Sequence, residues 1–289
     1  MDNAMLTWQQ GLVLTLALAA VAVVCSLVHR AVARTLAPFA REATIIAGLY
    51  SLWQLAGTLS VRGTQGAFAR ARWIERTEHA LHLPRESDLQ VLVDNRATAH
   101  VADLYYATMH FGVLFVFLVW LFVRHRDRYR EVRRVLAVAT FICLLIQLLP
   151  VAPPRLLPGY VDTAARYGDS VYGNGSGADE LSAMPSVHVA WAVLVGWSVW
   201  RIGRGRWRVL GPLHAVVTVV VVVSTANHWW ADGVVAVAVL VVARLLCRGG
   251  ERVTTRLFGR DERIDHDTDR APELSGPPQR VILPSSPST

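Results

Sequence analysis

The stretch "AVVTVVVVVSTANHWWADGVVAVAVLVVARLL", residues 215–246, decides the fold of this chain. It contains two long apolar runs that are separated by the short polar motif "NHWWAD" at residues 227–232. An α-helix needs roughly 20 mostly apolar residues to cross a bilayer. Each run, taken with its flanks, therefore predicts a membrane-spanning helix, and the polar motif is expected at the membrane surface between the two helices.

Similar apolar runs occur along most of the chain. Of its 289 residues 53% are hydrophobic, and the mean hydropathy is +0.34, which is typical of a membrane protein. The fold class that we expect is therefore all-α, a polytopic membrane helix bundle. The first run is interpreted as a retained span and not as a signal peptide, because no basic residue precedes it. The seven predicted spans lie near residues 11–29, 42–61, 102–123, 133–150, 185–201, 208–226 and 229–247.

The arginines predict which ends of the spans face the cytoplasm. The net charge is +7, and all 29 basic residues are Arg, so any cationic role falls to Arg. Short cytoplasmic loops are enriched in basic residues. With seven spans the Arg-rich segments share one side, the N-terminus lies outside, the C-terminus is cytoplasmic, and the loops 151–184 and 226–230 face outward. The Arg-rich segments are 30–41, 124–134, 201–208 and 244–252.

Other segments are not predicted to span. Residues 66–98 mix apolar side chains with nearly balanced charges, which predicts one or two amphipathic helices on the outer interface. The tail from about residue 254 is charged and then rich in Pro and Ser, which is typical of disorder. The motif "GNGSG" at 173–177 is expected to be a flexible loop and lacks the features of a nucleotide-binding loop. The three cysteines lie inside apolar runs, so no disulfide framework is expected.

The motif "MPSVH", residues 184–188, is a second polar motif on the predicted outer face. Pro185 suits the first turn of a helix, where its missing N–H is no loss. The N–H groups of Ser186, Val187 and His188 would then be unpaired donors at a helix start, which attracts anions. The motif therefore predicts a phosphate-binding helix start, and the alternative is a histidine that merely bonds within that turn.

The motif "HWWAD" places His228 and Asp232 four residues apart. On a helix this spacing puts both side chains on one face. A carboxylate on one ring nitrogen fixes the tautomer and leaves the other nitrogen free as a nucleophile or base. A structural polar pair remains the alternative for this motif alone. Trp229 and Trp230 are interpreted as anchors in the membrane interface, and the alternative is that they stack on the substrate.

Two further positions are candidates for substrate binding. Arg155 follows the proline-rich "PVAPP", which should stiffen the chain, and a guanidinium can bind phosphate oxygens in a bidentate manner. The alternative for Arg155 is contact with lipid head groups. His110 lies inside the third predicted span and is either a packed core histidine or a substrate contact, and Asn227 is a candidate contact beside His228.

Together "PVAPPR", "AMPSVH" and "HWWAD" resemble the three signature motifs of the type 2 phosphatidic acid phosphatase superfamily, most closely its inositol phosphotransferase branch. The resemblance covers roughly residues 42–247. It implies a six-helix phosphatase-like core, here with one extra N-terminal transmembrane helix. The corresponding division of the chain is 1–41 for that helix and linker, 42–250 for the membrane domain and 251–289 for a cytoplasmic tail.

The resemblance also implies a role for each motif residue. His228 becomes the nucleophile that takes the phosphoryl group, with Asp232 as its orienting partner. His188 becomes the general acid for the leaving group, and Arg155 with Ser186 would hold the phosphate. No cofactor, metal ion or nucleic acid is implied, and the active site is expected on the extracytoplasmic face.

The chain departs from the phosphatase members at two positions. Their first motif usually holds a lysine and an arginine, whereas here Arg155 stands alone, and Val222 replaces the usual arginine six residues before the nucleophile. The inositol phosphotransferase branch also lacks that arginine, so the departure favours head-group transfer from a phospholipid or lipid phosphate. The acceptor is left open between water and a hydroxyl such as that of inositol.

Two other functional classes are open at this point. His188, His228 and Asp232 could ligate a metal ion as a metalloenzyme site. The chain could also be a lipid-phosphate transporter or a non-catalytic membrane protein. A transporter is expected to show broken helices or paired half-repeats, and the sequence has no such pattern.

Overall fold

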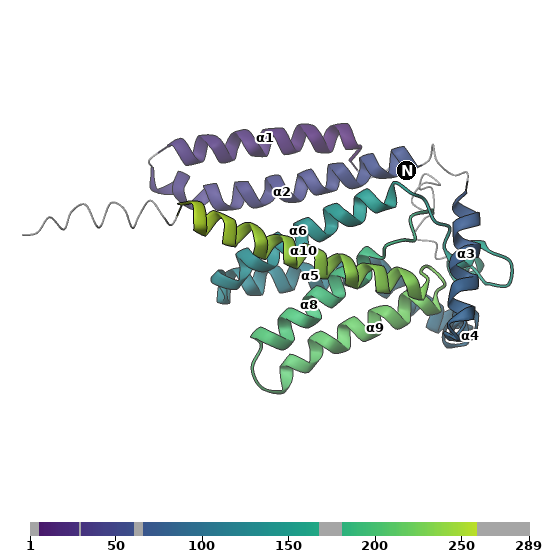
Figure 1. Ribbon diagram of the computed structural model, residues 1–289. Helices are drawn as coiled ribbons and strands as arrows, with labels where there is room; N and C mark the ends of the chain where they lie inside the picture. The colour runs from purple at the N-terminus through teal and green to yellow at the C-terminus, as the bar shows by residue number, and fades with distance from the viewer. Residues whose placement is uncertain (1–5, 29, 61–65, 168–180, 259–289) are drawn as a thin grey trace, which may run out of the picture. The chain divides into compact units, whose positions relative to one another are not determined.

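The computed structural model describes residues 6–28, 30–60, 66–167 and 181–258, and these are almost entirely helical (Figure 1). Apart from one β-bridge between Val151 and Ser182, no strand pairing occurs in these ranges. The all-α prediction is confirmed. The longer helices are α1 (Trp8–Leu27), α2 (Ala31–Ser60), α5 (Arg96–Arg124), α6 (Arg126–Gln147), α8 (Val187–Ile202), α9 (Leu210–Ser224) and α10 (Trp230–Phe258). The shorter ones are α3 (Ala67–Ala80), α4 (Glu86–Leu89), η2 (Gln90–Val93), η3 (Pro154–Leu156), α7 (Thr163–Tyr167) and η5 (Gly205–Val209).

Four of the described helical segments are long and apolar enough to cross a membrane. The helix α8 is a shorter apolar helix, and α2 and α6 coincide with the two other predicted spans, each beginning with an Arg-rich segment. The chain is therefore a multi-pass membrane helix bundle. The four segments are Trp8–Leu27, Arg96–Arg124, Gly205–Ser224 and Trp230–Gly250.

Several element boundaries differ from the sequence-based expectation. The Arg-rich linker is not a loop: from Ala31 it belongs to α2, with Pro38 inside the helix, because its Ala and Arg residues favour helix strongly. The third span begins earlier than predicted, at Arg96, where the Asn95 side chain accepts the N–H of Thr98 at 3.0 Å and caps the helix. The helix α10 continues to Phe258, past the expected start of the tail at about residue 254, while the remainder of the tail and the 173–177 loop lie outside the described residues.

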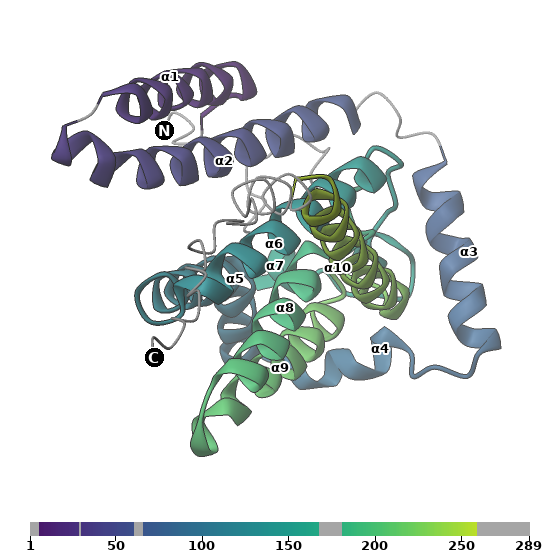
Figure 2. The same cartoon turned by 60° about the vertical axis from the view of Figure 1, so that its left-hand side comes forward.

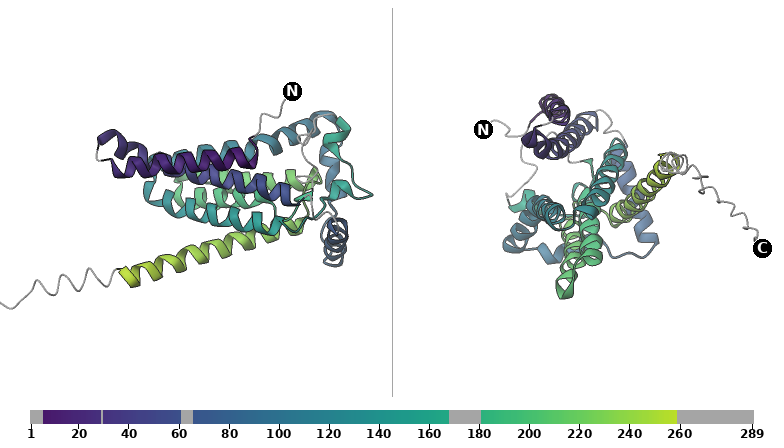
Figure 3. Two further views of the ribbon diagram at one scale, coloured as in Figure 1. Left: turned by 90° about the horizontal axis from the view of Figure 1, so that it is seen from above. Right: turned by 90° about the vertical axis from the view of Figure 1, so that its left-hand side faces the viewer.

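The chain divides into two compact units, Met1–Cys247 and Arg248–Thr289, and the bundle described below belongs to the first. Within this unit α1 and α2 form an antiparallel hairpin, which Figure 3 shows from two sides. The Tyr50 hydroxyl and the Gln54 amide both donate to the carbonyl of Leu6, at 2.9 and 2.7 Å. Glu42 on α2 accepts from Tyr129 at 3.0 Å and pairs with Arg133, which ties the hairpin to α6.

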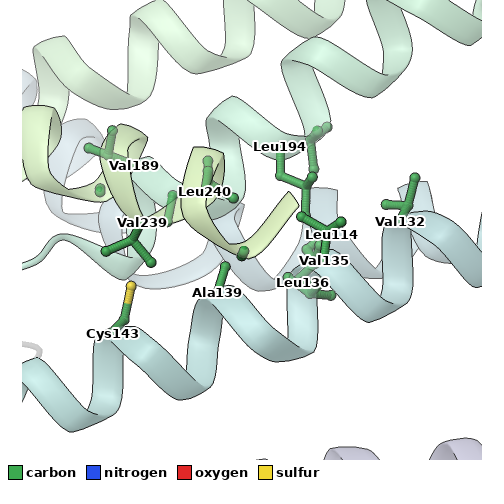
Figure 4. Packing of buried hydrophobic residues seen from close by; sticks show 14 of the residues in the cluster. Leu114, Val132, Val135, Leu136, Ala139, Cys143, Val189, Leu194, Val239 and Leu240 are labelled. Carbon is green, nitrogen blue, oxygen red and sulfur yellow. The ribbon is translucent and has the colours of Figure 1, made fainter. Parts of the chain in front are cut away.

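The main hydrophobic core lies between α5, α6, α8, α9 and α10 (Figure 4). A Cβ on Gly196 of α8 would lie 2.9 Å from the carbonyl oxygen of Gly211, so this glycine permits α8 and α9 to approach closely. The core therefore fixes the starts of α8 and α10, where the predicted site residues lie. Its labelled members in Figure 4 include Leu114, Val135, Cys143, Val189, Leu194 and Val239.

The helix α3 crosses the long helices at the end of the bundle where α9 ends and α10 begins (Figures 1 and 2). As predicted it has two faces: Trp73 is 63% exposed, whereas Ile74 is buried. Its buried face packs with Trp229 in a second apolar cluster. Trp229 is thus not an interface anchor as expected, because it is 1% exposed and its indole N–H donates to the carbonyl of Ala152 at 2.9 Å.

Candidate active site

The connection from α9 to α10 places His228 inside the protein. Ala226 adopts a positive φ of 52°, and the N–H groups of Asn227 and His228 both bond the carbonyl of Val222 at 3.1 Å. This tight turn reverses the chain just beyond α9 and brings the imidazole of His228 to 4% exposure. Val222 itself is 2% exposed in the hydrophobic core, so this position, six residues before His228, supplies no cation.

His228 and Asp232 are paired, but not through the helix face that their spacing predicted. The helix α10 begins at Trp230, so His228 precedes it, and Asp232 in the first turn reaches back. One carboxylate oxygen, Oδ2, accepts the backbone N–H of Trp229 at 2.9 Å and lies 3.2 Å from Nδ1 of His228. The carboxylate therefore caps its own helix and holds the ring with the same atom.

The surroundings of His228 fix its tautomer. Nδ1 faces two acceptors, the carbonyl of Ala183 at 2.8 Å and Oδ2 of Asp232 at 3.2 Å, so Nδ1 must carry the hydrogen. Nε2 is buried and has no hydrogen-bond partner among the described residues. A neutral ring with a bare, oriented Nε2 is suited to act as a nucleophile.

The start of α8 lies directly against the start of α10. Ser186 is the N-cap of α8: its side chain accepts the N–H of Val189 at 3.3 Å, and its own N–H bonds the backbone carbonyl of Asp232 at 3.4 Å. Pro185 therefore precedes the cap and does not occupy the first turn, which corrects the expected helix start by two positions. The first-turn amides are those of Val187 and His188, which have no acceptor within the helix itself.

His188 lies among aromatic rings. Its ring stacks on Tyr106 with centroids 4.2 Å apart, meets His110 edge-on at 4.2 Å and lies 5.7 Å from the ring of His228. Nδ1 of His188 is buried without a hydrogen-bond partner in the described part of the chain. The two predicted catalytic histidines are thus neighbours, and His110 belongs to the same cluster, with its Nδ1 bonded to the Tyr106 carbonyl at 2.8 Å.

Arg155 is held in place, as the prolines around it predicted. It lies in η3 and is 8% exposed, with Nε donating to Asn227 at 2.9 Å and one terminal nitrogen donating to Asp162 at 3.0 Å. The amide of Asn227 also donates to Thr225 at 2.9 Å. Arg155 therefore reaches the site through Asn227, the residue before His228, and Asn227 has both amide atoms engaged in holding the turn.

The sequence did not identify two partners of the histidines. Tyr106 stacks on His188, and its position four residues before His110 on α5 was the available signal, because such residues share a helix face. The Ala183 carbonyl that accepts from His228 has no signal in the sequence, because any residue supplies a carbonyl. Among the described residues, no group of three or more His, Cys, Asp or Glu is placed to hold a metal ion.

One cavity of about 280 Å³ lies elsewhere, beside η2 and α7. Gln90, Asp94, Thr163 and Arg166 contribute to its lining, and none of the predicted site residues does. The candidate active site is therefore defined by the convergence of its side chains and not by this cavity.

Comparison with known proteins identifies one family. The model of the PAP2 superfamily matches residues 72–246, more than half of the chain, and this match includes Arg155, both site histidines and Asp232. It begins within α3, so α1 and α2 lie outside it, and it is shorter than the region expected from the motifs. Neither the comparison with curated proteins nor that with solved structures gives a match.

Proposed function

Because this chain belongs to the PAP2 superfamily, we propose that it transfers the phosphoryl or phospho-head group of a membrane lipid through a phosphohistidine at His228. Membership supports a phosphatase-type activity on lipid phosphates in general, and the apolar helices make the chain a multi-pass membrane protein. The observation that carries the proposal is the fixed ring of His228, whose Nδ1 bonds two oxygens while the buried Nε2 is left without a partner in the described structure.

In the first step, Nε2 of His228 attacks phosphorus and the bond from phosphorus to the leaving oxygen breaks. The positive charge that develops on the ring is stabilised by Asp232. His188, 5.7 Å away between ring centroids, donates a proton to the leaving alkoxide. In the second step His188 takes a proton from the acceptor hydroxyl, which attacks phosphorus and releases His228.

The phosphate itself is held at the meeting point of the two helix starts. The first-turn amides of α8 and its dipole favour an anion there, and the Ser186 hydroxyl keeps its own proton to donate. Arg155, whose guanidinium is paired with Asp162, supports the site through its bond to Asn227, and His110 lies beside His188. Transfer to a hydroxyl such as that of inositol is supported by the buried Val222, because the site has fewer cations than is usual for hydrolysis of a phosphate monoester.

The site is proposed to face the extracytoplasmic side. The Arg-rich segments 124–134 and 201–208 lie at the opposite ends of α5, α6, α8 and α9 from the two histidine-bearing helix starts. Reporter fusions at residues 178 and 255 measure this directly. We expect the first outside and the second in the cytoplasm, and reporters on the same side would reject the seven-span orientation.

The activity is tested by incubating the purified protein with a panel of lipid phosphates and phospholipids, with and without inositol. We expect a phosphorus-containing product that depends on His228, either inorganic phosphate or a transferred head group, and its identity names the acceptor. No product from any substrate, together with movement of lipid phosphate across vesicle membranes, would instead identify a transporter.

A further inference from the structure

The helix α3 contributes a hydrogen bond to the start of α10. Oε1 of Glu78 accepts the backbone N–H of Ala231 at 2.7 Å. Ala231 directly precedes Asp232 in the first turn of α10, where an N–H has no acceptor within its own helix. A second bond joins α10 to the connection between α3 and α4, because the indole of Trp230 donates to the carbonyl of Pro84 at 2.8 Å. These two bonds therefore hold the start of α10, the helix that carries Asp232, against α3 and the residues that follow it.

Glu78 forms a pair with a second buried carboxyl group, that of Glu86. Their side chains are 4% and 2% exposed, and the two carboxyl groups lie close enough for Glu86 to raise the pKa of Glu78. Oε2 of Glu78 and Oε1 of Glu86 are buried, and neither has a donor in the described ranges. Two ionised carboxylates only accept hydrogen bonds, so the pair requires a proton between its members.

The charges around Glu78 favour keeping that proton. Burial, the interaction with Glu86 and the nearby charge of Asp232 raise the pKa of Glu78 to about 9 and outweigh the opposite effect of the hydrogen bond from the Ala231 N–H. The Tyr160 hydroxyl donates to Glu75 at 3.2 Å and to Glu86 at 3.4 Å, and burial beside these carboxylates raises the pKa of this phenol. The two charged groups that shift the pKa of Glu78, Glu86 and Asp232, are both acidic.

We propose that Glu78 is a positioning residue for the reaction, which as a protonated acid shared with Glu86 fixes the start of α10 and thereby aims Nε2 of His228. This inference rests on the proposed function of His228. Asp232 holds His228 and the Trp229 amide through one oxygen, so any movement of the first turn moves the imidazole with it. A misplacement of about 1 Å can cost on the order of 10²-fold in rate.

The proposal has a definite pH dependence. Loss of the shared proton would leave Glu78, Glu86 and Asp232 as neighbouring negative charges, so the rate should fall as the pH rises towards about 9. The stability follows the same sign. Because the pKa of Glu78 is about 9 in the native state against 4.5 ordinarily, the native state binds more protons, and stability decreases as the pH rises through this window.

The decisive variants are Glu78→Gln and Glu78→Ala, compared in the full-length protein. A glutamine accepts the Ala231 N–H and donates to Glu86 without titrating, so it should keep the rate of phosphoenzyme formation at pH 7 within about 3-fold and remove the alkaline loss. The alanine should reduce that rate by roughly 10- to 100-fold with little change in KM. Glu75→Gln is the matched control, because Glu75 contacts Tyr160 but not α10, and it should keep the wild-type profile.

Two measurements test the pair without turnover, and so separate its failure from failure of the proposed function. Infrared spectra should show a carboxylic acid carbonyl band that persists at pH 7 and disappears in Glu78→Gln. Hydrogen exchange of the segment 227–233 should be faster in Glu78→Ala than in wild type or Glu78→Gln. A glutamine variant as defective as the alanine variant would mean that a charged carboxylate is needed and would overturn the proposal, as would the absence of the band.

Discussion

The starts of α8 and α10 look alike in sequence but differ in the environment of their histidines. His188 and His228 each lie within two residues of a helix start, and their ring centroids are 5.7 Å apart. Nδ1 of His228 faces two oxygen acceptors at 2.8 and 3.2 Å. Nδ1 of His188 is buried without a partner in the described structure, and the ring lies between Tyr106 and His110.

The difference separates a fixed ring from an adaptable one. Two acceptors on Nδ1 commit His228 to a single tautomer and stabilise its charged form once Nε2 has reacted. Aromatic rings hold His188 by their faces and edges without specifying which nitrogen carries a proton. A ring that must give up a proton in one step and take one in the next is better served by the second arrangement. The predictions below test this division of roles.

The largest expected effect is the loss of His228. His228→Ala should abolish both turnover and any covalent phosphoenzyme, whatever the leaving group, because it removes the proposed nucleophile, Nε2 of the ring that Ala183 and Asp232 orient. His188→Ala should still become labelled by p-nitrophenyl phosphate, since its leaving group needs little protonation. The label should persist because the second step lacks its base. The measurement is acid-labile, alkali-stable radioactive phosphate on the protein after a short incubation.

The wild-type enzyme with the same substrate provides the control, as its label should appear and then turn over. Label on His228→Ala would show that the nucleophile lies elsewhere. Accumulation of label in His228→Ala and not in His188→Ala would show that the roles of the two helix starts are reversed.

The next largest effect should come from the carboxylate that distinguishes the two environments. Asp232→Asn keeps an oxygen or an N–H near Nδ1 but removes the negative charge that stabilises the ring, and it permits the wrong tautomer. We expect phosphoenzyme formation to slow by about 10²- to 10⁴-fold, measured by rapid quench. Little change in rate would mean that the Ala183 carbonyl alone orients His228.

Much of this architecture could be predicted because membrane helices follow local rules. Each of the seven longer helices in the described ranges overlaps a predicted span, and four of them are long and apolar enough to cross a bilayer. Boundaries were less certain: the Arg-rich start of α2 is helical because helix propensity and packing on α1 outweigh its polarity. The docking of α3 on Trp229 depends on contacts between distant segments, which no local pattern encodes.

The candidate site likewise has features that the sequence predicts and features that only the tertiary structure reveals. The spacing of four residues correctly predicted that His228 and Asp232 are partners. The predicted geometry was wrong, because the two residues do not share a helix face: His228 precedes α10, and Asp232 lies in its first turn. The stacking of Tyr106 on His188 and the bond from Glu78 to Ala231 join different helices, so they appear only once the bundle is assembled. Residue types and motifs can therefore nominate a site, whereas the partners that orient its side chains come from tertiary structure.

A smaller effect is expected from Arg155, which is linked to His228 through the neighbouring Asn227. Arg155→Lys keeps the charge but cannot bond Asn227 and Asp162 at once as the planar guanidinium does. Hydrogen bonds to charged groups contribute about 1.5–3 kcal/mol, so we expect a loss of roughly 10- to 100-fold in kcat/KM. Steady-state rates of the purified variant measure this, with Arg166→Lys, an exposed arginine, as the control. A wild-type rate would remove Arg155 from the site.

The smallest effect should follow chelation of metal ions, and it tests whether the two helix starts are halves of one metal site. Asp232 lies on the Nδ1 edge of His228, whereas the open nitrogen is Nε2 on the opposite edge, so a single ion could not readily take both. The proposed steps need only imidazoles, a carboxylate and an arginine.

Exhaustive treatment with EDTA should therefore leave the rate of phosphoenzyme formation within about 2-fold of the rate of the untreated enzyme. The substitutions above are expected to reduce that rate 10-fold or more. A mock-treated sample is the control for damage to the protein. If activity disappears and returns with Zn²⁺ or Mn²⁺, the contrast between the histidines reflects metal ligation, and His228 is not the nucleophile.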